Sequence, residues 1–141
     1  MSINDYNYMS YFKQGPDQVV ELDINYVKYL SNEAFTSLEK YLNETDKKTI
    51  VMTHFPPHRS GTSTPKYLAE KSVTNLYFAW PDGTLQNFNL KNVLTWISGH
   101  THWSYDFMQD GVRLIGNQLG YKSEVGITGL NEDGLYEIIV S

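Results

Sequence analysis

The spacing of apolar residues predicts one long amphipathic helix in the first third of the chain. Between residues 23 and 45, apolar side chains recur at intervals of three and four, which puts them on one helical face. These side chains are Val27, Leu30, Ala34, Leu38 and Tyr41. Asp23 is a suitable N-cap, and the polar run 43–48 ends the helix. Residues 1–20 have weak periodicity and predict no element.

Two short runs of β-forming residues follow, at 49–53 and 93–98. Both runs are continuous rather than alternating, which is typical of strands that are covered on both faces. The segment 55–65 holds three prolines and a glycine, so we expect a loop there. Residues 66–79 are a candidate second helix.

A β-hairpin is predicted after the second run. Apolar and polar residues alternate between Trp103 and Phe107, as in a half-exposed strand. The pair Asp110-Gly111 is a hairpin turn signal, and residues 112–116 supply the partner strand.

The remaining residues complete an α/β domain with a mixed sheet and flanking helices. Residues 117–131 contain three glycines and predict loops, and residues 135–140 predict a last strand. Sites in open α/β sheets lie beyond the carboxyl ends of the strands.

Composition narrows the class of protein. The chain has 141 residues, 40% of them hydrophobic, which suits one globular domain or a large fragment of one. Its net charge is −5, which argues against a nucleic-acid module that neutralises phosphates. The absence of cysteine excludes thiolate metal sites and fits a cytoplasmic protein. The polar start of the chain predicts no signal peptide, and no run is long enough for a membrane span.

All four histidines fall in two clusters, and each cluster comes directly after a predicted strand. His54 and His58 follow the first strand, and His100 and His102 follow the second. Imidazole is a good ligand for manganese, iron and zinc, and a strand end holds such a ligand on rigid backbone. A single histidine is more often a surface or hydrogen-bonded residue, but the repeated strand–histidine pattern favours a metal site.

The same segments resemble motifs of the calcineurin-like metallophosphoesterases. Residues 50–56 (IVMTHFP) are similar to that family's strand–His–x–Pro motif, and residues 99–102 (GHTH) match its Gly-His-x-His motif. Residues 117–121 (NQLGY) resemble the Asn-Pro-x-Gly-Tyr motif of bacterial and viral members. Residues 4–6 (NDY) also resemble a segment that those members have upstream of these motifs.

This resemblance implies a two-metal phosphoesterase that hydrolyses phosphate mono- or diesters by a metal-bridging hydroxide. It implies that His54 and His100 bind one divalent ion (Mn, Fe or Zn) and that His102 binds the other. His58 is a candidate contact for the substrate phosphate, although a solvent-facing loop histidine is the preferred interpretation.

The chain departs from the family by lacking its earlier motifs, Asp-x-His, Gly-Asp-x-x-Asp and Gly-Asn-His-Glu. Residues 1–141 therefore resemble a single partial domain, the C-terminal half of a four-layer αββα sandwich. No catalytic residue is identifiable in this chain. We expect little activity from it alone, an uncovered apolar sheet face, and a partner that is either the missing N-terminal half or a second copy.

Two alternatives stay open at this point. The chain could be a non-catalytic or mononuclear metal-binding module derived from the same fold, because three histidines can hold one zinc ion with an open position. It could also be a decayed gene product, although residues 49–58 and 93–102 keep their patterns. No residue selects among the substrates of the family.

Overall fold

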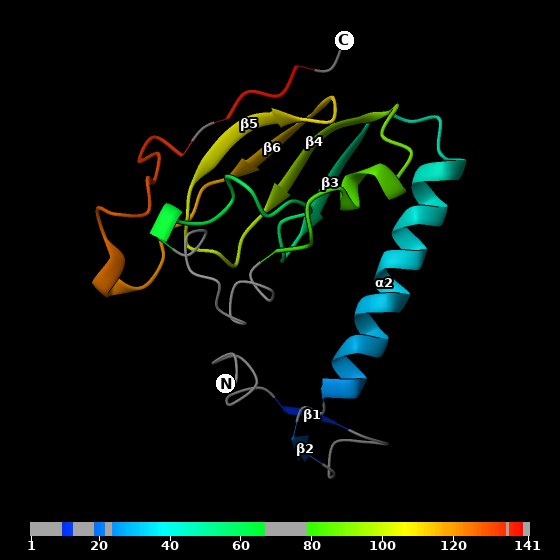
Figure 1. Cartoon of the computed structure of the whole chain (residues 1–141), viewed down its shortest axis with the longest axis horizontal. Helices are drawn as coiled ribbons and strands as arrows, with labels where there is room; N and C mark the ends of the chain where they lie inside the picture. The colour runs from blue at the N-terminus through cyan, green and yellow to red at the C-terminus, as the bar shows by residue number, and fades with distance from the viewer. Residues whose placement is uncertain (1–9, 13–18, 22–23, 67–78, 135, 140–141) are drawn as a thin grey trace. The chain divides into compact units, whose positions relative to one another are not determined.

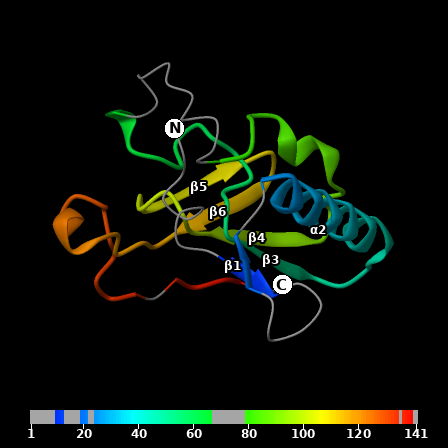
Figure 2. The ribbon, with the colours of Figure 1, turned by 90° about the horizontal axis from the view of Figure 1, so that it is seen from below.

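The computed structural model describes residues 10–12, 19–21, 24–66, 79–134 and 136–139. The chain divides into two compact units, residues 1–41 and 42–141, and each is described by itself. Figures 1 and 2 show their elements from two directions. No helix among the described residues is both long enough and apolar enough to cross a membrane.

The first unit contains a small two-stranded sheet and most of the long helix. Strand β1 (Ser10–Phe12) pairs antiparallel with β2 (Val19–Glu21), a pairing that the weak periodicity of this region did not predict. Helix α2 (Ile24–Glu44) confirms the predicted helix to within one residue at each end, while its predicted N-cap, Asp23, lies outside the described residues.

The second unit is built on a four-stranded mixed sheet. Its strands are β3 (Thr49–Thr53), β4 (Val93–Ser98), β5 (Tyr105–Gln109) and β6 (Val112–Gly116). They lie in the order β3-β4-β6-β5, with β3, β4 and β6 parallel and β5 antiparallel to β6 (Figure 1). This confirms an α/β fold with a mixed sheet.

The predicted hairpin is confirmed at β5 and β6. Gln109 faces Val112 across its turn. The two turn residues have left-handed backbone, with φ 49° at Asp110 and 81° at Gly111. Two successive positive φ angles make the turn whose twist matches the flanking strands, and Asp-Gly is one of the pairs that adopt it most readily.

One face of this sheet forms the core around Trp96. Trp96 is 0% exposed, and its ring packs against those of Trp80 and Phe88 at centroid distances of 5.9 and 5.4 Å. Its indole Nε1 donates a 2.9 Å hydrogen bond to Thr53 Oγ1 on the neighbouring strand. This tryptophan therefore ties the segment 79–90 and strand β3 to the middle of the sheet.

The opposite face carries exposed apolar side chains. The strand register aligns Ile50, Thr95, Arg113 and Met108 in one row across it. Ile50 is 45% exposed, Met108 is 62% exposed, and Met52 on the same face is 74% exposed. The expectation that residues 49–53 are covered on both faces is therefore wrong. In the described sheet β3 lies at the edge, where apolar residues can face solvent.

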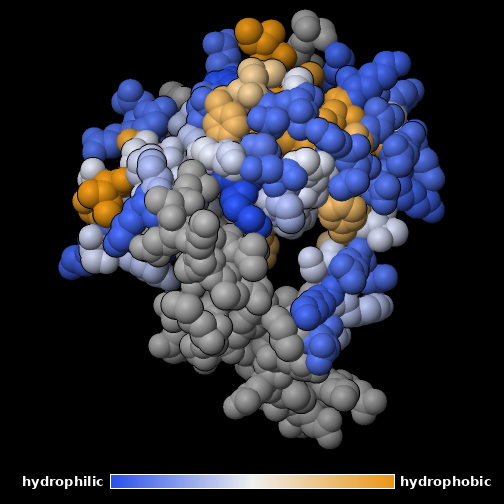
Figure 3. Space-filling view, viewed as in Figure 1, coloured by the Kyte–Doolittle hydropathy of each residue, from blue (hydrophilic) through white to orange (hydrophobic). Residues whose placement is uncertain are grey.

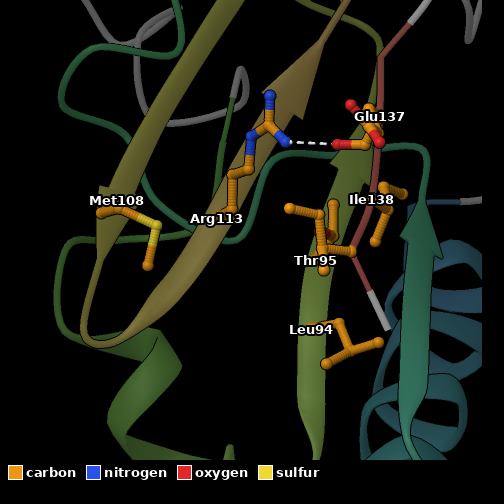
Figure 4. Close-up of a pocket in the computed structure, with 7 residues that line it drawn as sticks. Leu94, Thr95, Met108, Arg113, Glu137 and Ile138 are labelled. Carbon is orange, nitrogen blue, oxygen red and sulfur yellow. Dashed lines mark hydrogen bonds between the residues drawn. The ribbon is translucent and has the colours of Figure 1, made fainter. Parts of the chain in front are cut away.

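The C-terminal residues lie beside this face without joining the sheet. Residues 136–139 form no strand, so the prediction of a last strand is wrong for them. The Arg113 guanidinium donates to the Glu137 carbonyl at 2.7 Å (Figure 4) and forms a bidentate pair with Asp106. A side-chain contact thus holds the segment near β4 and β6, in place of a backbone ladder.

Two further predictions concern the connecting segments. The predicted helix 66–79 lies almost wholly outside the described residues. Residues 117–131 are loops apart from one short 3-10 turn, Lys122–Glu124, as their glycines predicted.

Candidate metal centre

The sheet brings two histidines to the same edge. Strands β3 and β4 are parallel neighbours, so their carboxyl ends meet there. His54 directly follows β3, and Gly99 and His100 directly follow β4. The Gly99 N–H donates a 3.1 Å hydrogen bond to the His54 carbonyl, which continues the pairing of the two chains into the loop that bears the histidines.

His54 and His100 are in direct contact. His54 Nε2 lies 3.0 Å from His100 Nδ1, and the rings meet edge to face with centroids 4.8 Å apart. The ring of Phe55 packs against the ring of His100, with the two centroids 4.3 Å apart. Two ring nitrogens of the predicted ligand pair therefore face each other across a hydrogen bond.

This separation is close to that of two ligands of one metal ion. Imidazole nitrogens bind zinc at about 2.1 Å in a tetrahedral arrangement, so two of them lie roughly 3.4 Å apart. The observed 3.0 Å is shorter, so the two rings would have to separate slightly to admit an ion.

The turn between β4 and β5 contains strained backbone. His100 and His102 have φ angles of 70° and 52°, in the left-handed region that side chains other than glycine seldom adopt. Such residues cost on the order of 1–3 kcal/mol each and persist where their surroundings impose them. They gather at functional sites more often than elsewhere.

Gln118 is hydrogen-bonded to three residues of this turn. Its side chain is buried. Its Oε1 accepts a 2.7 Å hydrogen bond from the His102 N–H, and its Nε2 donates to Thr101 Oγ1 at 3.0 Å and to the Trp103 carbonyl at 2.7 Å. Three consecutive residues of the turn are thus fixed by one amide group.

The ends of the same turn are joined by hydroxyl groups. Ser98, the last residue of β4, and Tyr105, the first of β5, share a short hydrogen bond. Burial raises the pKa of Tyr105 to about 12, although the bond to Ser98 acts in the opposite direction. The phenol of Tyr105 therefore stays neutral. The two ends of the turn that carries His100 and His102 are joined by a hydrogen bond between two uncharged hydroxyl groups.

His102 points to a carboxylate and not to the other two histidines. Its Nδ1 lies 2.8 Å from Glu124 Oε2, and the Tyr121 ring meets the imidazole edge to face at 4.4 Å. Glu124 Oε2 also accepts the Tyr121 N–H at 2.7 Å. This backbone bond is the main cause that lowers the pKa of Glu124, with His102 adding to it.

His58 is separate from these residues and is buried. It is only 8% exposed, so the expectation of a solvent-facing histidine is wrong. Its Nδ1 lies 3.3 Å from Asp82 Oδ1, but among the described residues this nitrogen makes no hydrogen bond. The ring of Phe107 lies edge-on to it, 6.4 Å away.

Asp82 also holds the loop residues that directly follow His58. The Asp82 carboxylate accepts the N–H groups of Arg59 and Ser60 and the Ser60 hydroxyl. Burial by itself would raise the pKa of Asp82, but these hydrogen bonds outweigh it and lower the pKa. A role for His58 in phosphate binding stays a prediction.

In the described part of the chain, no three metal-binding side chains gather closely enough to hold an ion. Of the three predicted ligands, His54 and His100 come together, and His102 does not join them. The sequence motifs did not indicate Glu124 or Asp82 at all, because each acts on a histidine more than 20 residues away. Gln118 was indicated only as part of the motif-like segment 117–121.

An apolar surface adjoins His102. It consists of four exposed side chains, Leu119, Tyr121, Val125 and Ile127. Figure 3 shows apolar surface at this place, over the segment that Figure 1 draws in orange. Ile50 and Met52 on β3 are further exposed apolar side chains among the described residues.

Comparison with known proteins yields one distant relative to report. "Uncharacterized protein L509" of Acanthamoeba polyphaga mimivirus is 27% identical over 127 residues, which cover 87% of this chain and 44% of the relative. The chain thus spans less than half of that protein's length. No family model matches the chain, and no solved structure matches it.

Proposed function

We propose that this chain is the C-terminal half of a calcineurin-like metallophosphoesterase and works only when the other half is supplied. His54 and His100 bind one divalent ion, His102 binds a second, and the substrate is a phosphate mono- or diester. The fold is the second sheet of a four-layer αββα sandwich with its helices.

The observation that carries this proposal is the convergence of His54 Nε2 and His100 Nδ1 to 3.0 Å. The two residues are 46 positions apart in the chain and come from different strand ends. They are also the pair that the family motifs assign to one ion.

The chain's own residues hold and orient the ligands. Gln118 fixes the backbone of His102, and Phe55 supports the ring of His100. Bound together, two such ions would neutralise charge on phosphoryl oxygens and lower the pKa of the attacking water. The described residues supply no third ligand beside His54 and His100, and in this proposal the other half supplies the bridging carboxylate and the remaining ligands.

The alternative of a self-contained single-metal module has less support. Such a site needs three protein ligands around one ion. His102 does not join His54 and His100, and the described residues contain no group of three metal-binding side chains.

A manganese titration tests the proposed ligands on the chain as it exists. Sub-stoichiometric Mn²⁺ is expected to broaden the NMR ring signals of His54 and His100 first, because a paramagnetic ion affects nearby nuclei most. The ring of His58, which is buried beside Asp82, serves as an internal control and should stay sharp. In His100→Ala, broadening at His54 should require much more Mn²⁺. Equal broadening of all four rings would contradict the assignment.

The exposed sheet face predicts self-association of the isolated chain. Met52 is 74% exposed on a face that the other sheet would cover, and contiguous apolar surface favours association. Sedimentation velocity should show species larger than a monomer, and Met52→Lys should shift them toward monomer. Gln86→Lys adds the same charge at an exposed polar position and should leave the distribution unchanged. A wild-type chain that stays monomeric would contradict this prediction.

A further inference from the structure

We infer that Glu124 is a positioning residue of the proposed site: its carboxylate holds the His102 imidazole as the Nδ1–H tautomer and leaves Nε2 as the nitrogen that binds the second metal ion. This inference rests on the proposed function. It adds a residue that no sequence motif indicated.

The first support is the contact itself. Glu124 Oε2 lies 2.8 Å from His102 Nδ1. A carboxylate can only accept a hydrogen bond, so the proton in this contact belongs to the imidazole nitrogen. In a neutral imidazole, a proton on Nδ1 leaves the lone pair on Nε2. Metal-binding histidines generally use their second ring nitrogen in this way, and loss of the partner typically costs 10–100-fold in metal affinity or activity.

The second support is that the position of Glu124 is itself built. The same Oε2 atom accepts a 2.7 Å hydrogen bond from the Tyr121 N–H, so the position of the carboxylate does not depend on His102 alone. Gly120 has φ +71°, and a Cβ atom there would lie 2.8 Å from Glu124 Oε2 and 2.9 Å from Thr128 Cγ2. A glycine is therefore needed for the carboxylate to approach.

The third support is that the imidazole is held from its other sides. Its backbone N–H bonds to Gln118 Oε1 at 2.7 Å, and the Tyr121 ring packs edge-on against it at 4.4 Å. With the backbone, one ring face and Nδ1 fixed, the direction of Nε2 is determined by the chain alone.

The test is a long-range ¹H–¹⁵N spectrum of the His102 ring in the metal-free full chain. At a pH of about 8.5 the neutral ring predominates for an ordinary histidine, and the Nδ1–H pattern is expected. Glu124→Ala and Gly120→Ala should each abolish that preference. Glu124→Gln keeps an acceptor oxygen and should retain it. Glu132→Ala, at an exposed glutamate, is the matched control and should match wild type.

Either of two outcomes would overturn the inference: an Nε2–H pattern in the wild-type ring, or an unchanged Nδ1–H pattern in Glu124→Ala. Unaltered indole and backbone signals would show that each variant is folded. Because this readout needs neither metal nor activity, it can fail while the metallophosphoesterase proposal stands. Absence of metal binding with an intact Nδ1–H pattern would contradict the proposed function alone. In a metal-binding completed domain, Glu124→Ala should weaken binding by about 10–100-fold.

Discussion

Replacing Trp96 with alanine is expected to lower the free energy of unfolding of residues 42–141 by about 3–5 kcal/mol. The side chain is 0% exposed and packs against Trp80 and Phe88, so truncation leaves a large cavity. It also removes the donor to Thr53 Oγ1. Folded domains are typically stable by only about 5–15 kcal/mol, so this loss is a large fraction of the stability that a domain ordinarily has.

Urea denaturation followed by far-ultraviolet circular dichroism measures this loss without depending on tryptophan fluorescence. Trp103→Ala is the matched control, because Trp103 is partly exposed and precedes β5. Its cost should be about 1 kcal/mol, the ordinary effect of a point substitution. Similar costs for the two variants would mean that Trp96 is not the centre of the core.

The strands and the histidine pair were predictable because their signals are local. Residues 49–53, 93–98 and 112–116 are β-forming runs bounded by turn residues, and the structure has strands at those positions. Two parallel strands that each end in histidine place those histidines at one edge. The contact between His54 and His100 follows from the sheet order.

The residues that orient the site were not predictable, because their contacts are long-range. Glu124 contacts His102 across 22 positions in the sequence. Asp82, from a distant loop, accepts a hydrogen bond from the residue that follows His58. Strand lengths of three residues at β1 and β2 are too short to produce a readable period.

The apolar run at 49–53 correctly predicted a strand, but the prediction that both faces of this strand are covered was wrong. A continuous apolar run indicates that a strand is suited to burial on both faces. It does not indicate which surface provides the cover. The 74% exposure of Met52 fits a strand whose second covering layer belongs to a segment outside this chain, as the proposed half-domain requires.

Activity is expected to appear when the chain is completed. The mimivirus relative has more than half of its length outside the match, and under the proposed function that remaining part would supply the missing ligands. Fused to this chain in Mn²⁺, it should hydrolyse bis(p-nitrophenyl) phosphate, whereas neither part alone should do so. Metal ions contribute several kcal/mol to such reactions, and each 1.36 kcal/mol is tenfold in rate.

His100→Ala in that fusion should therefore lower kcat/KM by about 10³-fold, since it removes one of two converging ligands. Gln86→Lys, an exposed change away from the strand ends, should leave kcat/KM unchanged. The decisive measurement is the phosphodiesterase kcat/KM of the fusion, its His100→Ala variant and the isolated chain. The half-site account predicts an active fusion, a nearly inactive variant and an inactive chain. An isolated chain as active as the fusion, or a fusion indifferent to His100, would contradict it.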